Sequence, residues 1–215
     1  MRMNQIALTV ILLVFVLCLW SSNSHGYIVG RTQTGKVIKW KSNSVTVYIN
    51  PTDGPTWAYS AIVAAANTWN DVSTSSFKFN TTTSNISYSS YSRTYPRKDG
   101  YNLVTFGPIE SKYVWCGIAG QTYTWTYTPL NSQVAYITEV DMRINTNYGI
   151  NTDGSSSGYD LQSIATHEFG HWLRLMDLYN SGDTEKTMYG RISFGQTNKR
   201  SLDQDDIDGI TYLYP

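Results

Sequence analysis

Residues 160–173 read DLQSIATHEFGHWL and place two histidines four positions apart, at His167 and His171. The apolar spacing predicts a helix over residues 160–174 with Asp160 as its N-cap. Residues four apart share one face of a helix, so both imidazoles can reach one metal ion. Glu168 follows the first histidine and can take a proton from water beside that metal. Zinc accepts nitrogen and oxygen ligands and keeps an open position in catalytic sites, so the pattern predicts a catalytic zinc centre.

Two imidazoles do not complete a catalytic zinc site, so a third ligand is needed. The only other histidine of the chain, His25, lies in a segment that we expect to be removed. An acid should therefore supply the ligand, and the candidates just downstream are Asp177, Asp183 and Glu185. On a straight helix Asp177 would lie about 240° around the axis from His171. Asp177 can reach the metal only if the chain turns after the helix.

The first 26 residues have the order of a secretory signal peptide. Arg2 precedes an apolar run over residues 6–20, and the small, polar stretch SSNSHG follows over residues 21–26. The run is shorter than the roughly 20 residues of a spanning helix, although an uncleaved anchor is the alternative. We expect cleavage after Gly26, a single domain over residues 27–215, and a secreted, extracellular protein that meets the membrane only transiently. The mature chain would keep one cysteine, Cys116, and so no internal disulfide.

Composition excludes several classes of protein. Sixteen Lys and Arg residues balance sixteen Asp and Glu residues, whereas a nucleic-acid binder usually carries a basic excess. The 41% hydrophobic content is enough for a core, so the chain is not disordered. Two cysteines exclude a disulfide-rich scaffold and a four-cysteine zinc site.

Hydrophobic periodicity predicts an α+β or mixed α/β domain with one sheet. A polar, glycine-rich loop is expected over residues 149–158, and residues 81–91 fit either a loop or an exposed strand. Ser201 and Gln204 fit a capping box at the start of the last helix. The expected strands cover residues 45–49, 77–79, 103–106, 120–128 and 138–145, and the expected helices cover residues 56–72, 160–174 and 201–213.

Four blocks of the sequence resemble the matrixins, the matrix-metalloproteinase branch of the metzincins. Residues 160–173 resemble their active-site helix, residues 187–189 (TMY) their Met-turn, residues 200–214 their closing helix, and residues 61–73 their first helix. The resemblance runs from about Trp40 to the end of the chain. It implies a zincin/metzincin fold of the α+β class, with one twisted mixed sheet, an antiparallel edge strand and three helices. It also implies a monomeric zinc metalloendopeptidase that acts on proteins or peptides with one catalytic zinc. A structural calcium ion is neither predicted nor excluded.

Two positions depart from the family pattern H-E-x-x-H-x-x-G-x-x-H. Arg174 stands at the glycine position and Asp177 at the third-histidine position. An aspartate there is similar to the snapalysin-like peptidases, so the resemblance implies the ligand set His167, His171 and Asp177. The glycine normally adopts a positive φ, which arginine can adopt at a cost of about 1–2 kcal/mol. These departures leave open a catalytically weak or inactive metallopeptidase-like binding protein.

The resemblance gives roles to further residues. Met188 would form a hydrophobic floor below the metal, or be an ordinary core residue. Tyr189 would line the pocket for the residue after the cleaved bond or assist the oxyanion, unless it only packs. The substrate would lie extended along an edge strand near residues 117–123, with the possible substrate pocket including Gly117, Ile118 and Ala119.

Other features carry weaker expectations. Tyr- and Thr-rich strands leave a cell-surface structural or adhesive module as a remote second alternative. Cys116 is expected to be a small buried residue, and Asn80 and Asn85 fit glycosylation acceptors. Residues 27–40 contain no cysteine, so we do not expect the cysteine-bearing pro-segment that is typical of matrixins. We also do not expect a C-terminal appendage.

Overall fold

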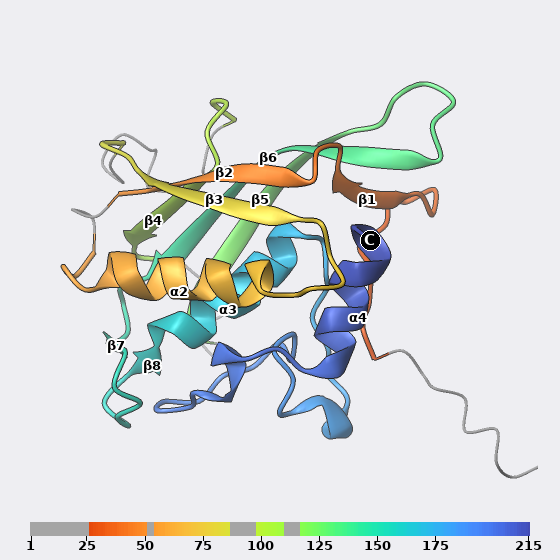
Figure 1. The fold of residues 1–215 in the computed structure, drawn as a ribbon. Helices are drawn as coiled ribbons and strands as arrows, with labels where there is room; N and C mark the ends of the chain where they lie inside the picture. Colours follow the sequence, from red (N-terminus) through yellow and green to blue (C-terminus); the bar gives the residue numbers. More distant parts are fainter. Residues whose placement is uncertain (1–25, 51–53, 87–97, 110–116) are drawn as a thin grey trace, which may run out of the picture.

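The computed structural model describes residues 26–50, 54–86, 98–109 and 117–215, which form a sheet with helices packed against one face (Figure 1). In this part of the chain none of the helices is long and apolar enough to cross a membrane. The main strands are β1 (Val37–Trp40), β2 (Ser44–Ile49), β3 (Lys78–Thr83), β4 (Leu103–Gly107), β5 (Gly120–Tyr127) and β6 (Val134–Asn145). The helices are α2 (Ala58–Asn70), α3 (Leu161–Trp172) and α4 (Gln204–Leu213), with two 3₁₀ turns, η2 (Ser181–Asp183) and η3 (Asn198–Arg200).

The long strand β6 organises the sheet. It pairs in parallel with β1 through its first residues and with β4 through its last residues, so β1 and β4 share one of its edges. β2 lies between β4 and β3, again in parallel. β5 pairs antiparallel with β6 along the other edge, with a bulge between Trp125 and Thr126. The predicted mixed sheet with an antiparallel edge strand and three α-helices is therefore confirmed.

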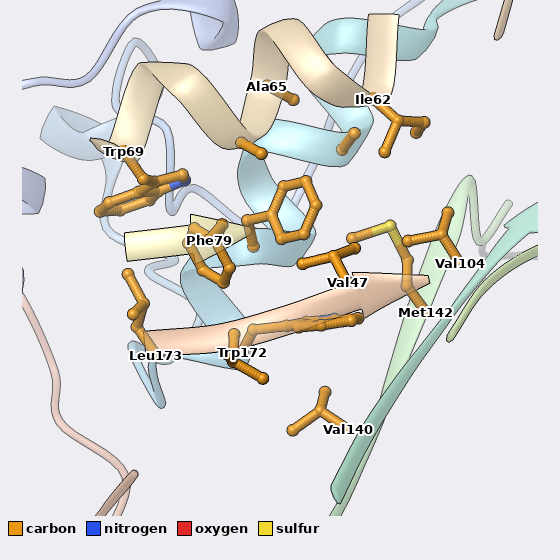
Figure 2. Packing of buried hydrophobic residues seen from close by; sticks show 14 of the residues in the cluster. Val47, Ile62, Ala65, Trp69, Phe79, Val104, Val140, Met142, Trp172 and Leu173 are labelled. Carbon is orange, nitrogen blue, oxygen red and sulfur yellow. The ribbon is translucent and has the colours of Figure 1, made fainter. Parts of the chain in front are cut away.

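The core lies between the sheet and the two central helices (Figure 2). β2 turns Val45, Val47 and Ile49 inward at every second residue, as its alternation predicts. α2 presents an apolar face of alanines, Ile62 and Trp69 to α3. The indole nitrogen of Trp69 donates a hydrogen bond to the Thr166 carbonyl at 2.8 Å, which fixes α2 against α3.

The second face of β6 is polar and still buried. Glu139, Asp141, Arg143 and Asn145 alternate with Val140, Met142 and Ile144, and all are at most 4% exposed. The polar side chains bind loop backbone: Glu139 accepts hydrogen bonds from the Asp99 and Gly100 amides, and Asp141 accepts one from the Leu103 amide. This row of side chains therefore fixes the segments that enter β4 and β5.

Several predicted boundaries change. The capping box predicted at Ser201 and Gln204 is wrong: α4 begins at Gln204, its N-cap is Asp203, and the Asp206 carboxylate accepts the Asp203 amide at 3.0 Å. α2 and α3 are shorter than predicted, and the predicted strand over residues 138–145 extends back to Val134. The predicted loop over residues 149–158 begins with β7 (Ile150–Asn151), which pairs with β8 (Tyr159–Asp160) in a second small sheet.

Residues 81–83 belong to β3, which settles part of the segment that the sequence left open. Asn80 and Asn85 are both exposed. The predicted signal segment up to Ser24 and His25, with Cys18, lies outside the described residues, as does Cys116.

Candidate metal centre and cleft

The helix α3 begins and ends with specific backbone contacts. Asp160 is its N-cap, as predicted, and accepts the Ser163 amide at 2.8 Å. At the other end Arg174 adopts a φ of 70°, and the Leu175 amide donates to the Gly170 carbonyl while the Arg174 amide donates to the His171 carbonyl. This pair of bonds is a Schellman motif, which usually has glycine at the left-handed position. The turn that Asp177 needs is therefore made with arginine in the glycine position.

The segment after this turn is held on both sides. The Gly30 amide donates to the Arg174 carbonyl at 2.7 Å, and the Met176 amide donates to the Ile28 carbonyl at 2.8 Å. The Leu178 amide then donates to the Met188 carbonyl at 2.8 Å. Asp177 lies between these two anchors and is directed back towards α3.

The two histidines are oriented by backbone carbonyls. His167 Nδ1 lies 2.7 Å from the Thr187 carbonyl oxygen, and His171 Nδ1 lies 2.8 Å from the Leu175 carbonyl oxygen. A carbonyl only accepts, so each Nδ1 carries a proton and each neutral ring presents a bare Nε2. The two Nε2 atoms lie 3.1 Å and 3.4 Å from Asp177 Oδ1.

These three atoms fit a metal ion. His167, His171 and Asp177 offer ligand atoms that lie within 4.8 Å of one another. Two bare nitrogens and a carboxylate oxygen have only lone pairs to share, and a cation among them satisfies all three; nitrogen and oxygen donors of this kind suit zinc. Without a cation, a protonated imidazole has to balance the negative charge of the Asp177 carboxylate. Burial opposes protonation of His171, but the nearby Asp177 raises the pKa of its imidazole. Burial likewise opposes ionisation of Asp177, but the two imidazoles hold the pKa of its carboxyl well below the usual range.

Glu168 lies beside this group and is 4% exposed. Its Oε2 accepts a hydrogen bond of 2.6 Å from the Thr122 hydroxyl on β5. Gly120, also on β5, approaches so closely that an added Cβ would lie 2.9 Å from Glu168 Oε1 and 2.7 Å from the Ile164 side chain. The edge strand and α3 therefore confine the Glu168 carboxylate between them.

A cleft of about 680 Å³ opens over these residues. It is lined by Glu168 and by the side chains of His167, His171 and Asp177. The predicted pocket residues also line it: Gly117, Ile118, Ala119 and Tyr189. Asn145 fixes one wall: its side-chain amide donates to the Ile118 carbonyl at 2.7 Å, and its backbone amide donates to the Ala119 carbonyl at 2.9 Å.

The remaining candidates lie apart from the three ligand atoms. Asp183 forms an ion pair of 2.9 Å with Lys186, and Glu185 accepts a hydrogen bond of 3.1 Å from Asn198. Met188 is 1% exposed and packs on α3, where any side chain at Gly170 would overlap its sulfur.

Two buried polar residues are among the cleft-lining residues that the sequence did not indicate. Lys199 lines the cleft and is only 2% exposed, and Ser163 lines it and is fully buried. Lysine is almost never fully buried unless paired, so no local pattern indicated Lys199. Ser163 occupies an inward position of α3 near its N-terminus, which only the three-dimensional arrangement reveals.

Comparison with known proteins assigns the fold to a family. The matrixin family model matches residues 39–215. Human neutrophil collagenase is 45% identical over 60 residues, which is 28% of this chain and 12% of that protein. Metalloendoproteinase 1 of Glycine max is 48% identical over 59 residues, 27% of this chain and 18% of that protein, so the matches span under a fifth of each relative. The crystal structure of myroilysin is 18% identical with a TM-score of 0.44, covering 87% of this chain and 94% of that one. Because the family model spans all of the sheet but the first two residues of β1, together with α2, α3, α4 and the residues His167, His171 and Asp177, the chain belongs to the matrixin family.

Proposed function

We propose that this protein is a secreted zinc endopeptidase whose single catalytic domain covers residues 27–215 after removal of residues 1–26. The observation that supports this most is the convergence of three ligand atoms, from His167, His171 and Asp177, on a cleft that also holds the Glu168 carboxylate. Family membership supports a peptidase independently of that geometry.

The three side chains would hold one zinc ion, and the backbone would keep them in place. The Thr187 and Leu175 carbonyls fix the two rings, so that the metal-facing nitrogens are set before the metal arrives. When bound, zinc acidifies a water molecule and polarises the carbonyl of the scissile peptide.

Glu168 is the proposed general base. The Thr122 hydroxyl occupies Oε2, and Oε1 receives no hydrogen bond from the described residues, so Oε1 is the oxygen that handles the proton. It takes the proton from the attacking water and passes it to the leaving amine. Because Thr122 and Gly120 confine the carboxylate, little reorganisation is needed before this transfer.

The substrate would be a peptide in extended conformation along β5. One edge of β5 is paired with β6, and the strand runs from the cleft wall at Gly120 past Glu168. An unpaired strand edge can bind another strand through main-chain hydrogen bonds, with pockets selecting side chains. The scissile bond would then lie beside His167, His171 and Asp177.

The test is metal content together with peptide cleavage, with and without a chelator. We expect one zinc per chain and cleavage that the chelator abolishes. Glu168→Gln should keep the zinc and the fold but lower turnover by about 10²–10⁴ or more, because it removes a base and not a ligand. Glu185→Gln is the matched control, since Glu185 lies outside the ligand group.

Wild-type turnover by Glu168→Gln would contradict the assigned base. A wild-type protein that binds zinc and peptides without cleaving them would instead support the binding-protein alternative that Arg174 and Asp177 suggest.

A further inference from the structure

A buried lysine lines the cleft and does not take part in the proposed reaction. Lys199 belongs to η3 and is 2% exposed. Its Nζ donates to the Tyr189 carbonyl and lies 5.6 Å from the centre of the Tyr189 ring. Within the described part of the chain, no carboxylate lies within ion-pair distance of Nζ. Burial lowers the pKa of Lys199 to about 8, although Asp177, Asp206 and Glu168 favour its charged form from farther away.

A buried hydroxyl lines the same cleft. The Oγ of Ser163 is fully buried and makes no hydrogen bond with the described residues. Buried hydroxyls are normally hydrogen-bonded, so a free one on a cleft wall indicates a ligand acceptor.

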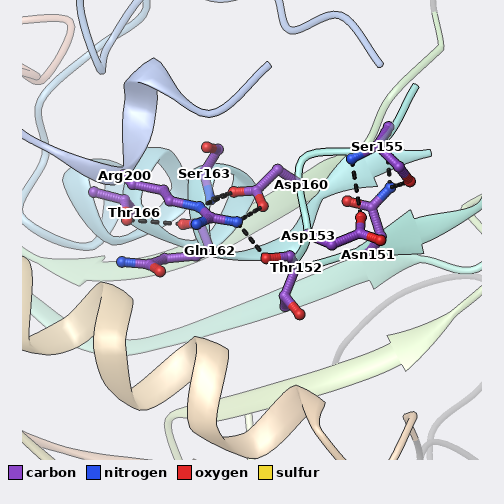
Figure 3. Close-up of polar contacts among 9 residues, drawn as sticks. All are labelled: Asn151, Thr152, Asp153, Ser155, Asp160, Gln162, Ser163, Thr166 and Arg200. Atoms are coloured by element: carbon purple, nitrogen blue, oxygen red, sulfur yellow. Dashed lines mark hydrogen bonds and ion pairs between the residues drawn. The ribbon is translucent and has the colours of Figure 1, made fainter. Parts of the chain in front are cut away.

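The acids nearby are already engaged. Asp160, at the N-terminus of α3, accepts the Ser163 amide and forms an ion pair of 2.5 Å with Arg200 (Figure 3). Asp206 accepts the amides of Thr187 and Asp203 through Oδ2 and forms no ion pair with Lys199. Glu168 and Asp177 belong to the proposed catalytic centre. The cleft wall therefore offers an ammonium that has a carbonyl but no carboxylate as its partner, and a hydroxyl with no hydrogen-bond partner among the described residues.

We infer that this part of the cleft binds an acidic side chain of the substrate, glutamate or aspartate, close to the cleaved bond, with Lys199 and Ser163 as its partners. This inference rests on the proposed peptidase function and specifies its substrate class. The location follows from the cleft itself, whose lining includes the proposed base Glu168 as well as Lys199 and Ser163. An apolar substrate side chain would enclose the ammonium without a counterion, whereas a carboxylate pairs with it.

Lys199 is a stronger determinant than the other cation of the cleft. Arg191 also lines the cleft, but its side chain is exposed, and exposed charges are screened by water and salt. The buried ammonium discriminates between charged and neutral side chains because its environment is drier.

The experiment begins with a randomised peptide library, in which the cleavage sites are read by mass spectrometry. A matched pair of peptides then carries glutamate or glutamine at the position near the cleaved bond where the library shows the strongest selection, and kcat/KM is measured for both. Glutamine has the same shape without the charge. We expect glutamate to be preferred by at least about tenfold, the order expected for a hydrogen bond to a charged group.

Lys199→Met should abolish this preference, Lys199→Arg should retain part of it, and Ser163→Ala should reduce it less than Lys199→Met. Lys39→Met is the matched control: Lys39 Nζ also donates to a carbonyl, that of Leu213, and also lies near a tyrosine ring, at 5.7 Å from that of Tyr214. Lys39 is not part of the cleft lining, so its loss should leave the preference unchanged.

Cleavage without a preference for the acidic residue would overturn the inference while the peptidase function stands. A preference that survives Lys199→Met would overturn it as well. Binding of the two peptides to the zinc-loaded Glu168→Gln variant, measured by calorimetry, gives a readout without turnover. Tighter binding of the glutamate peptide would support the inference even if no peptide is cleaved, and equal binding would contradict it.

Discussion

Replacing Arg200 with methionine tests how the helix that carries His167 and His171 is held. Asp160 is fully buried and is the N-cap of α3. Its carboxylate accepts hydrogen bonds from the Ser163 amide at 2.8 Å, from Arg200 Nε at 3.0 Å and from Arg200 Nη2 at 2.5 Å. Arg200→Met keeps part of the aliphatic stem but removes both hydrogen bonds from the guanidinium (Figure 3). Of the three hydrogen bonds to the Asp160 carboxylate, only that from the Ser163 amide then remains.

The magnitude follows from the burial of the two side chains. Breaking a buried ion pair by removing one partner costs about 3–5 kcal/mol. The Arg200 side chain is 34% exposed, so water can reach the vacated place and reduce the cost. We expect the free energy of unfolding to fall by about 2–3 kcal/mol. Asp160→Asn keeps a good N-cap but removes the charge, so Arg200→Met in that background should cost about 1 kcal/mol or less.

The assay is urea unfolding of all four proteins in the presence of a chelator, followed by tryptophan fluorescence. The chelator keeps metal binding from contributing to the measured stability. The slope of the transition should be unchanged, so that shifts of the midpoint report stability. A cost of Arg200→Met below about 1 kcal/mol, or the same cost in both backgrounds, would refute the argument that the pair anchors α3.

Three further predictions concern the centre and the sheet. Asp177→Ala should lower zinc affinity by at least about 100-fold, and Asp177→His should retain zinc. Both affinities are measured by competition with a metal-binding dye. An unchanged affinity of Asp177→Ala would show that Asp177 is not the third ligand, and Asp183 and Glu185 would be mutated next. Gly120→Ala should lower kcat by at least about tenfold with zinc retained, because the added methyl group displaces Glu168. Gly182→Ala is the control, because a methyl group there meets nothing within 4 Å. A Gly120→Ala variant as active as the wild type would contradict the confinement of Glu168. Burial raises the pKa of Asp141 to about 8, so the folded state keeps a proton that the unfolded state has lost above about pH 4, and stability should fall as pH rises from about 4 to 8. Asp141→Asn should lessen this fall by more than about 1 kcal/mol in urea unfolding at several pH values, and an identical pH dependence would exclude Asp141 as its source.

Local patterns predicted the elements well because each pattern has a direct physical cause. Histidines four residues apart, such as His167 and His171, face the same side only on a helix, and Asp160 caps the N-terminus of that helix. The alternation of side chains was sufficient to predict the strands β2 and β5, but it contains no information on which strands they pair with. Only the resemblance to matrixins supplied the antiparallel edge.

The errors come from contacts between distant residues. Both Ser201 with Gln204 and Asp203 with Asp206 fit a capping pattern. Asp206 also accepts the Thr187 amide, so a distant contact favours the second pair. The burial of Lys199 likewise depends on Tyr189, ten positions earlier, and on the closing of η3 against α3.

The clamp between residues 28–30 and residues 174–176 has a consequence for synthesis on the ribosome. The ribosome makes the first of these segments about 145 residues before the second, and Asp177 is placed only when the two have met. A nascent chain that already exposes both histidines therefore lacks an organised third ligand. Since contacts this distant in sequence close late in folding, we expect the chain to acquire the proposed metal affinity, and with it the proposed hydrolytic capacity, only after residues 174–177 have been synthesised and have met residues 28–30.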